Sequence, residues 1–137
     1  MQHHFIDPYF FLEALLEFAT EFDWYPLINY EVDDMGRRIA KFDHQKIVGS
    51  LQPQTSSINF STSGNTHSLK YRFYCMSKYR INLGDFIYYH DRYLMVDGIQ
   101  EYDEAGVREC ELTMINLSDY RDFEDYINYI NGTKTVW

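Results

Sequence analysis

Residues 81–99 read INLGDFIYYHDRYLMVDGI, and this stretch decides the fold. A Gly-Asp pair, Gly84 and Asp85, precedes two short runs of aromatic and branched residues, DFIYY and YLMVDGI. The tight HDR connection between the runs predicts a hairpin of antiparallel strands. Gly84 permits a bend into the first strand, and Asp85 can satisfy free backbone N–H groups there. The stretch therefore predicts structure, because no recognisable catalytic group lies in it.

Strands are also predicted on both sides of this hairpin. LKYRFYCMS at 69–77 alternates, with Tyr71, Phe73 and Cys75 on the core side, and RECELTMI after the YDEAGV turn alternates in the same way. Residues 69–115 thus predict an antiparallel meander that closes into a small barrel. A further strand is expected at 46–52, where the interior Gly49 indicates a bulge or a bend.

Helices and a second hairpin are expected at the two ends of the barrel. Segments 27–32 and 37–42 flank the turn DDMG. Asp7 and Pro8 can begin an N-terminal helix whose broad apolar face packs on the domain or on another subunit. A C-terminal helix capped by Ser118 or Asp119 and ended by Asn131-Gly132 precedes a tail that docks on a neighbour or packs on its own barrel. The candidates for docking subunits or rings are Phe11, Leu15, Phe18, Phe22, Val136 and Trp137.

The predicted fold class is therefore mainly β with flanking helices: a small antiparallel barrel, SH3-like or OB-like, with an N-terminal helix and hairpin and a C-terminal helix. One domain is expected over all 137 residues. It divides into an N-terminal helical arm at 1–26, a barrel at 27–117 and a C-terminal helix and tail at 118–137.

Composition limits the partners. The chain has 12 basic and 21 acidic residues, a net charge of −9, so general attraction to phosphate backbones is disfavoured. No run of about 18 apolar residues and no basic leader is present, and we expect neither a membrane span nor a signal peptide. Cys75 and Cys110 are expected to be buried free thiols of a reducing compartment, with a disulfide as the less favoured alternative.

The sequence gives little support for an enzyme, a metal site or a cofactor. His3 and His4 are adjacent and lack other ligands at zinc-site spacing, and the remaining histidines fall in or beside turns. Nucleophile elbows, phosphate loops and dinucleotide fingerprints are absent. Asp97-Gly98 and Asp103-Glu104 are explained by turn chemistry.

Strand aromatics raise the possibility of base stacking, because single-strand binders stack bases over a basic groove. The cations of such a groove would be Lys70, Arg72, Lys78 and Arg80, within an acidic whole. We interpret the aromatics as core and subunit interface, and a nucleic-acid or peptide-binding module remains the alternative.

Between the strand at 46–52 and the strand at 69–77, the segment 53–68 is rich in Ser, Thr and Asn. Such a long polar loop is either functional or disordered.

Taken together, IVGSLQPQTSS, the polar loop, the aromatic strand and LGDFIYYHDRYLMVDGI resemble the head-closure, or stopper, proteins of tailed bacteriophage necks. The family pattern of Gly-Asp-x-apolar-x-Tyr, a short turn and Tyr-x-apolar-Val covers roughly residues 46–117 here. It matches this sequence at Gly84, Asp85, Ile87, Tyr89, Tyr93 and Val96.

The resemblance implies a structural virion protein, made in the host cytoplasm, that forms a ring of six or twelve copies. The ring would lie below the portal or adaptor and above the tail terminator or tail tube, where viral DNA passes without tight binding. By the same resemblance, the polar loop would close the channel, with candidates Gln54, Ser56, Ser57, Asn59, Phe60, Ser61, Gly64, Asn65 and His67. An adaptor, a tail terminator or a tail-completion protein of the same neck is the related alternative.

Overall fold

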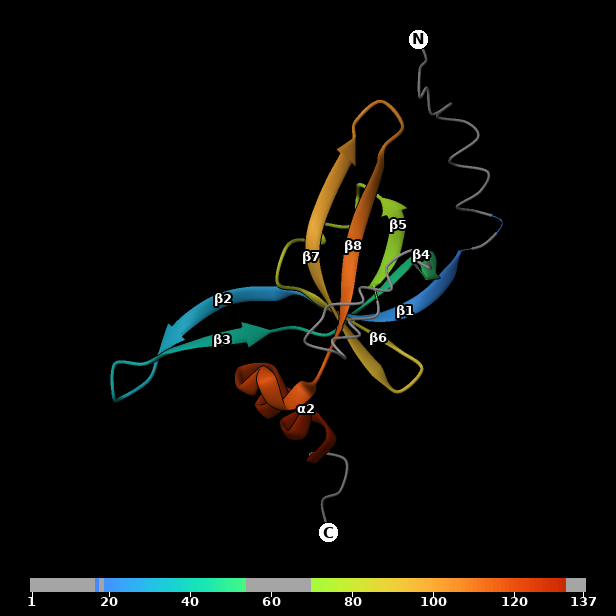
Figure 1. The fold of residues 1–137 in the computed structure, drawn as a ribbon. Helices are drawn as coiled ribbons and strands as arrows, with labels where there is room; N and C mark the ends of the chain where they lie inside the picture. Colours follow the sequence, from blue (N-terminus) through green and yellow to red (C-terminus); the bar gives the residue numbers. More distant parts are fainter. Residues whose placement is uncertain (1–16, 18, 54–69, 133–137) are drawn as a thin grey trace, which may run out of the picture.

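The structure is a computed structural model that describes residues 17, 19–53 and 70–132. From Thr20 to the end of the described part, eight strands precede a short 3-10 turn and one helix (Figure 1). In chain order these elements are β1 Thr20–Tyr25, β2 Leu27–Val32, β3 Arg38–Phe42, β4 Gln45–Pro53, β5 Lys70–Met76, β6 Phe86–Tyr89, β7 Arg92–Tyr102, β8 Val107–Ile115, η1 Leu117–Asp119 and α2 Arg121–Gly132.

Six of the strands form a closed antiparallel barrel in the order β1-β4-β5-β8-β7-β6, with β6 pairing back onto β1. β2 and β3 form a separate two-stranded sheet. The predicted fold class is therefore confirmed: a small antiparallel barrel with a hairpin and a C-terminal helix. Closing the sheet leaves the barrel strands without a free edge.

Alternating side chains fill the barrel, as period-two patterns require. Tyr71, Phe73 and Cys75 of β5 point inward opposite Leu112 and Cys110 of β8. The interior cluster is completed by Trp24, Ile47, Ile81, Ile87, Leu94 and Val96. Cys75 and Cys110 are free and buried, so the predicted burial of both side chains is confirmed.

The hairpin of β2 and β3 leaves the barrel at Pro26. Within the barrel β1 pairs with β4. Beyond Pro26 the chain of β1 continues into β2, which pairs with β3, the strand that leads into β4. Proline has no N–H to donate to a ladder, and here its carbonyl accepts a bond from the Asp43 N–H at 3.0 Å. Figure 1 shows β2 and β3 extending away from the barrel. We call residues 27–42 the arm.

A second core joins the arm, the barrel and α2. The Phe123 ring of α2 stacks on Phe86 of β6, with centroids 3.9 Å apart, and meets Phe42 of the arm edge-on at 5.1 Å. The Ala40 N–H of β3 donates to Asp122 Oδ2 at 2.9 Å. The helix thus fixes the base of the arm from one side, since Phe123 and Ile127 are buried there.

The predicted division of the chain is wrong at two places. Residues 20–25 were expected at the end of a helical arm, but they form β1, which closes the barrel between β4 and β6. Residues 27–42 were expected in the barrel, but they form the arm. The predicted N-terminal helix otherwise falls on residues outside the described part, apart from the helical Glu17.

The predicted meander over 69–115 is correct only in part. β6, β7 and β8 follow one another as neighbours, but β5 pairs with β4 and β8 and not with β6. The pairing differs because the chain after β5 crosses to the far side of β7 before it enters β6.

Two glycine predictions also change. Gly49 forms no bulge, because its pairing with Thr20 and Cys75 is regular; instead, a Cβ there would lie 2.4 Å from the Phe73 ring. Asp97-Gly98 forms no turn, because both residues lie inside β7, where the register with β8 shifts between Val96 and Gly98. That shift is a β-bulge.

The predicted helix start is one to two residues too early, because Tyr120 occupies the cap position that was predicted for Ser118 or Asp119. Leu117–Asp119 is a 3-10 turn, and α2 begins only at Arg121. The Glu124 N–H donates to the Tyr120 carbonyl at 2.9 Å, which is the first bond of the helix. The helix ends at Gly132, as predicted.

Candidate functional site

The Gly-Asp pair forms a corner that ties the arm to the barrel. Gly84 has φ +87°, a left-handed conformation that glycine adopts without strain. Asp85 follows it with only 1% of its surface exposed. Its Oδ1 accepts the Leu27 N–H at 2.9 Å, and its Oδ2 accepts Trp24 Nε1–H at 3.0 Å and the Asn82 N–H at 2.9 Å. One carboxylate therefore holds the last part of β1, the first residue of the arm and its own loop.

This environment suits a hydrogen-bond acceptor. Burial raises the pKa of Asp85, while the hydrogen bonds from Leu27, Asn82 and Trp24 act in the opposite direction. The three groups that bond to the carboxyl are all donors. The side chain thus has the structural role that the sequence predicted for it, which is to satisfy N–H groups at the bend.

The other residues of the predicted motif line the two cores. Ile87 and Val96 are buried in the barrel interior, and Tyr89 packs against it. Tyr93 belongs to the second core, between the barrel, the arm and α2, which we call the outer core. Its ring centroid lies 5.3 Å from that of Phe123. The hairpin turn consists of His90 and Asp91, both with positive φ, which matches a two-residue connection of the primed type. The interpretation of this stretch as barrel wall is confirmed.

Phe22 is the one predicted docking residue inside the described part, and its predicted placement on a helix is wrong. It was expected on a helix face, but it lies in β1 and packs on the barrel core, 5.6 Å from the Phe73 ring and 5.9 Å from the Tyr89 ring. Its side chain is occupied within its own subunit. The other docking candidates, Phe11, Leu15, Phe18, Val136 and Trp137, lie outside the described residues.

All nine channel-loop candidates, from Gln54 to His67, also lie outside the described residues. The strands that flank them are described, and Pro53 of β4 pairs with Tyr71 of β5. The segment therefore leaves and rejoins the barrel at neighbouring positions. β4 runs from Gln45 beside the arm to Pro53, so this place lies roughly 25 Å along the strand from the base of the arm.

The surface that sequence reasoning missed is the arm. Of the eight large hydrophobic side chains that are exposed among the described residues, four lie on it: Ile28, Tyr30, Val32 and Met35. Val32 is 67% exposed and Met35 92%. The alternating apolar residues of LINYEV predict a strand with one apolar face. Alternation alone does not show whether that face is covered by the rest of the protein.

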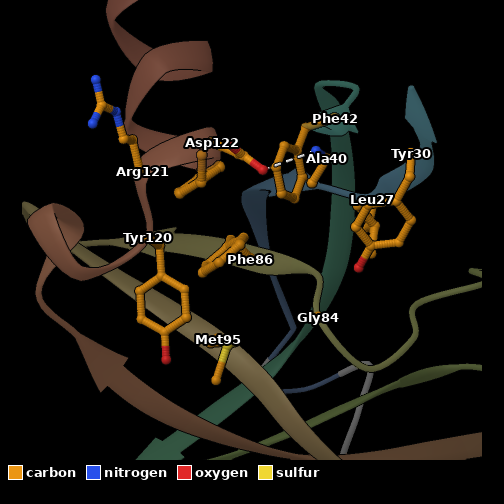
Figure 2. A pocket seen from close by; sticks show the side chains of 11 residues that line it. Leu27, Tyr30, Ala40, Phe42, Gly84, Phe86, Met95, Tyr120, Arg121 and Asp122 are labelled. Atoms are coloured by element: carbon orange, nitrogen blue, oxygen red, sulfur yellow. Dashed lines mark hydrogen bonds between the residues drawn. The ribbon is translucent and has the colours of Figure 1, made fainter. Parts of the chain in front are cut away.

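Two grooves run along the arm, one on each side of its contact with α2. The first, about 370 Å³, lies between the arm, the corner and the start of the helix (Figure 2). The second, about 430 Å³, lies between Ile39 and Lys41 of β3 and Tyr126 and Tyr129 of α2. Both are open hollows in which apolar side chains reach the surface.

The electrostatics do not favour a groove for nucleic acid. Lys70 Nζ lies 3.7 Å from Asp97 Oδ2, and Arg72 Nη1 lies 3.0 Å from Glu109 Oε2. Two of the four cations of the predicted basic cluster are thus paired with carboxylates of the same sheet. Their charge is not available to phosphate without breaking those pairs.

His44 contacts two residues of β1. His44 Nε2 lies 2.8 Å from Asp23 Oδ1, and its ring stacks on Tyr25 with centroids 4.7 Å apart. The hydrogen bond from Lys46, opposed by desolvation and supported by His44, lowers the pKa of Asp23. The contacts of Asp23 and Tyr25 with His44 and Lys46 hold β1 against the start of β4, beside the arm.

Alkaline pH should weaken the outer core. Burial raises the pKa of Tyr25 and of Tyr93. Because their folded pKa values lie above the unfolded value of about 10, their contribution to stability is complete below pH 10 and is lost as pH rises through the folded pKa. We expect the free energy of unfolding in urea to fall above pH 10, by up to about 1.4 kcal/mol per pH unit for each phenol.

The variant Tyr25→Phe should reduce that slope, and Tyr129→Phe, on an exposed ring, is the control that should leave it unchanged. An unchanged slope in Tyr25→Phe would show that this phenol is not protected in the folded state.

No protein-family model matches the chain, and no curated protein matches it significantly. Within residues 19–53 and 70–132, no group of three or more His, Cys, Asp or Glu side chains is placed to hold a metal ion. In the same part of the chain, no helix is long and apolar enough to cross a bilayer.

Proposed function

We propose that this chain is a structural, non-enzymatic subunit of the neck of a tailed bacteriophage virion. In this proposal it forms a ring between the portal or adaptor and the tail, and the ring closes the DNA channel and docks the tail. The observation that carries the proposal is the arm, a hairpin with exposed apolar side chains that projects from a closed barrel. The resemblance of the Gly-Asp hairpin to head-closure proteins supplies the biological setting.

A closed barrel cannot assemble by adding strands at an edge, and the arm offers a different surface for assembly. Because all six barrel strands are paired on both sides, the barrel has no edge at which a second copy can add a strand. A head-to-tail ring needs two different patches on each subunit, one given and one received. The arm supplies a patch that lies beyond the subunit's own barrel, and Asp85 and Phe123 hold its base in place.

The charge of the chain fits a channel that releases DNA. The net charge is −9, and the pairing of Lys70 and Arg72 with carboxylates reduces attraction to phosphate further. In the proposed ring the segment after Pro53 faces the channel, and Pro53 itself lies at the end of β4 that is far from the base of the arm. Channel closure and subunit contact are thereby assigned to separate parts of the barrel.

Native mass spectrometry of the full chain, over a range of concentrations, tests the proposal. We expect a closed oligomer of six or twelve copies, either alone or when neck proteins of the same virion are added. A monomer at every concentration, with and without those proteins, would rule out a ring subunit.

The same measurement separates the alternatives. Adaptor, tail-terminator and tail-completion proteins would also give rings, and their position is then decided by which neck protein co-assembles. A monomer that binds an oligonucleotide, with affinity that falls as salt rises, would instead support the nucleic-acid module.

A further inference from the structure

We propose that the arm of one copy docks on the groove between β3 and α2 of the next copy, with Arg38 of the first facing Asp125 of the second. This inference rests on the proposed ring, and it names the contact that builds it. The occupant of the groove is therefore a second copy of this chain.

The donated patch is one face of the arm. Tyr30 pairs with Ala40, and Val32 pairs with Arg38, so these four side chains share a face. Tyr30 is 52% exposed, and the Arg38 guanidinium lies over its ring, 4.4 Å from the centroid. This face thus presents two apolar side chains and a cation that is already aligned against an aromatic ring.

The charge of Arg38 is not satisfied within the described part of its own subunit. The arm carries three acidic and three basic residues. Two pairs form inside it, Arg37 with Asp33 at 3.4 Å and Lys41 with Glu31 at 3.9 Å. Arg38 forms no ion pair with any described residue, and it is the one arm cation left for an outside carboxylate.

The receiving patch lies on the opposite face of the arm and on α2. Ile39 and Lys41 alternate with Arg38 and Ala40 along β3, so they point to the other face. Together with Ala40 and Phe42, which contact α2, and with Tyr126 and Tyr129 of the helix, they line the groove of about 430 Å³. Tyr129 is 70% exposed, which leaves a large aromatic surface uncovered at the rim.

The two patches are complementary in charge. α2 carries three carboxylates and one arginine. Asp122 is committed to the Ala40 N–H, whereas Asp125, which lines the same groove four residues before Tyr129, forms no ion pair with any described residue. An unpaired cation beside Tyr30 on one face therefore corresponds to an unpaired carboxylate beside Tyr129 on the other.

This arrangement has the geometry that a ring requires. The donated side chains Tyr30, Val32 and Arg38 do not line the receiving groove, so the contact is head-to-tail and can close by rotation. Pairing of two β2 edges would instead be the same patch on both subunits and would stop at a dimer. Apolar contact supplies affinity, and the Arg38–Asp125 pair sets the register.

A charge swap tests the contact. Arg38→Glu and Asp125→Arg should each raise the concentration for half assembly roughly tenfold or more, because like charges then face each other. The double variant Arg38→Glu with Asp125→Arg should recover most of the assembly. Lys78→Glu, an exposed basic residue outside the arm, is the matched control and should assemble as the wild type does. Thermal unfolding of each variant shows that the fold is retained.

A cross-link gives a second, independent readout. Val32→Cys combined with Tyr129→Cys should form a disulfide between copies under mild oxidation, and ladders of cross-linked copies should appear. Cys75 and Cys110 are buried and should not contribute. Each single-cysteine variant is the control.

The outcomes separate this inference from the proposed function. A wild-type ring that is insensitive to the single charge reversals and gives no cross-link would overturn the docking contact and leave the ring standing. A dimer would overturn head-to-tail docking in favour of edge pairing. A wild-type monomer, alone and with neck proteins, would overturn both.

Discussion

Asp85→Ala is expected to destabilise the protein by about 3–5 kcal/mol, since three N–H groups in and around the core lose their acceptor at once. Trp24 Nε1–H lies in the barrel interior, and each buried donor left without a partner costs about 1–3 kcal/mol. That loss is a large part of the 5–15 kcal/mol that stabilises a typical domain. Urea unfolding followed by circular dichroism measures it.

Asp85→Asn is the informative companion variant. Its shape is nearly the same, but its NH₂ group is a donor. The least costly orientation places the NH₂ at the Oδ1 position, where it faces the Leu27 N–H, and keeps the oxygen for Trp24 and Asn82. We expect a clear but smaller loss than in Asp85→Ala, and faster hydrogen exchange at the Leu27 amide. Asp34→Asn, on an exposed carboxylate in the arm turn, is the control. If Asp85→Ala were as stable as that control, the corner would not hold the arm.

Phe123→Ala is expected to cost about 3–5 kcal/mol, the usual range for removing a buried aromatic ring. The ring contacts Phe42 of the arm and Phe86 of the barrel, so its loss should loosen α2 and the arm together. The Ala40 amide, which bonds to Asp122 of the helix, reports this directly by faster hydrogen exchange.

Asn128→Ala, at an exposed position of the same helix, is the matched control and should change stability by no more than about 0.5 kcal/mol. An Ala40 amide that exchanges at the wild-type rate in Phe123→Ala would show that α2 does not secure the arm.

Local patterns in the sequence were sufficient for most of the strands. The inward set Tyr71, Phe73 and Cys75 was predicted because a side-chain period of two reports directly on which face is buried. Gly84 and Asp85 were predicted for a similar reason, because a left-handed glycine and an N–H acceptor are local requirements of the bend.

Phe22 was missed because two periods overlap at that place. Phe18 and Phe22 are four apart, which fits a helix, but Phe22 and Trp24 are also separated by one acidic residue, which fits a strand. Tertiary pairing with β4 and β6 decided in favour of the strand. That decision depends on contacts such as Trp24 with Asp85, 61 residues apart, which no local pattern contains.

The candidate assembly surface was missed for a related reason. The apolar residues of β2 predict a strand, but whether their face is covered depends on where the hairpin leaves the barrel. Pro26 and the Asp85 corner determine that direction, and neither shows its consequence in the sequence. The sequence likewise does not show which faces of the arm and of α2 carry Arg38 and Asp125, so neither residue could be predicted as part of an assembly surface.

Electron microscopy of the purified full chain, with neck proteins added if needed, tests the central claim most directly. The proposed function predicts rings with a central opening, in which each arm reaches the next subunit and the segment after Pro53 faces the hole. Particles without rings, or a ring whose arms point away from every neighbouring copy, would contradict it.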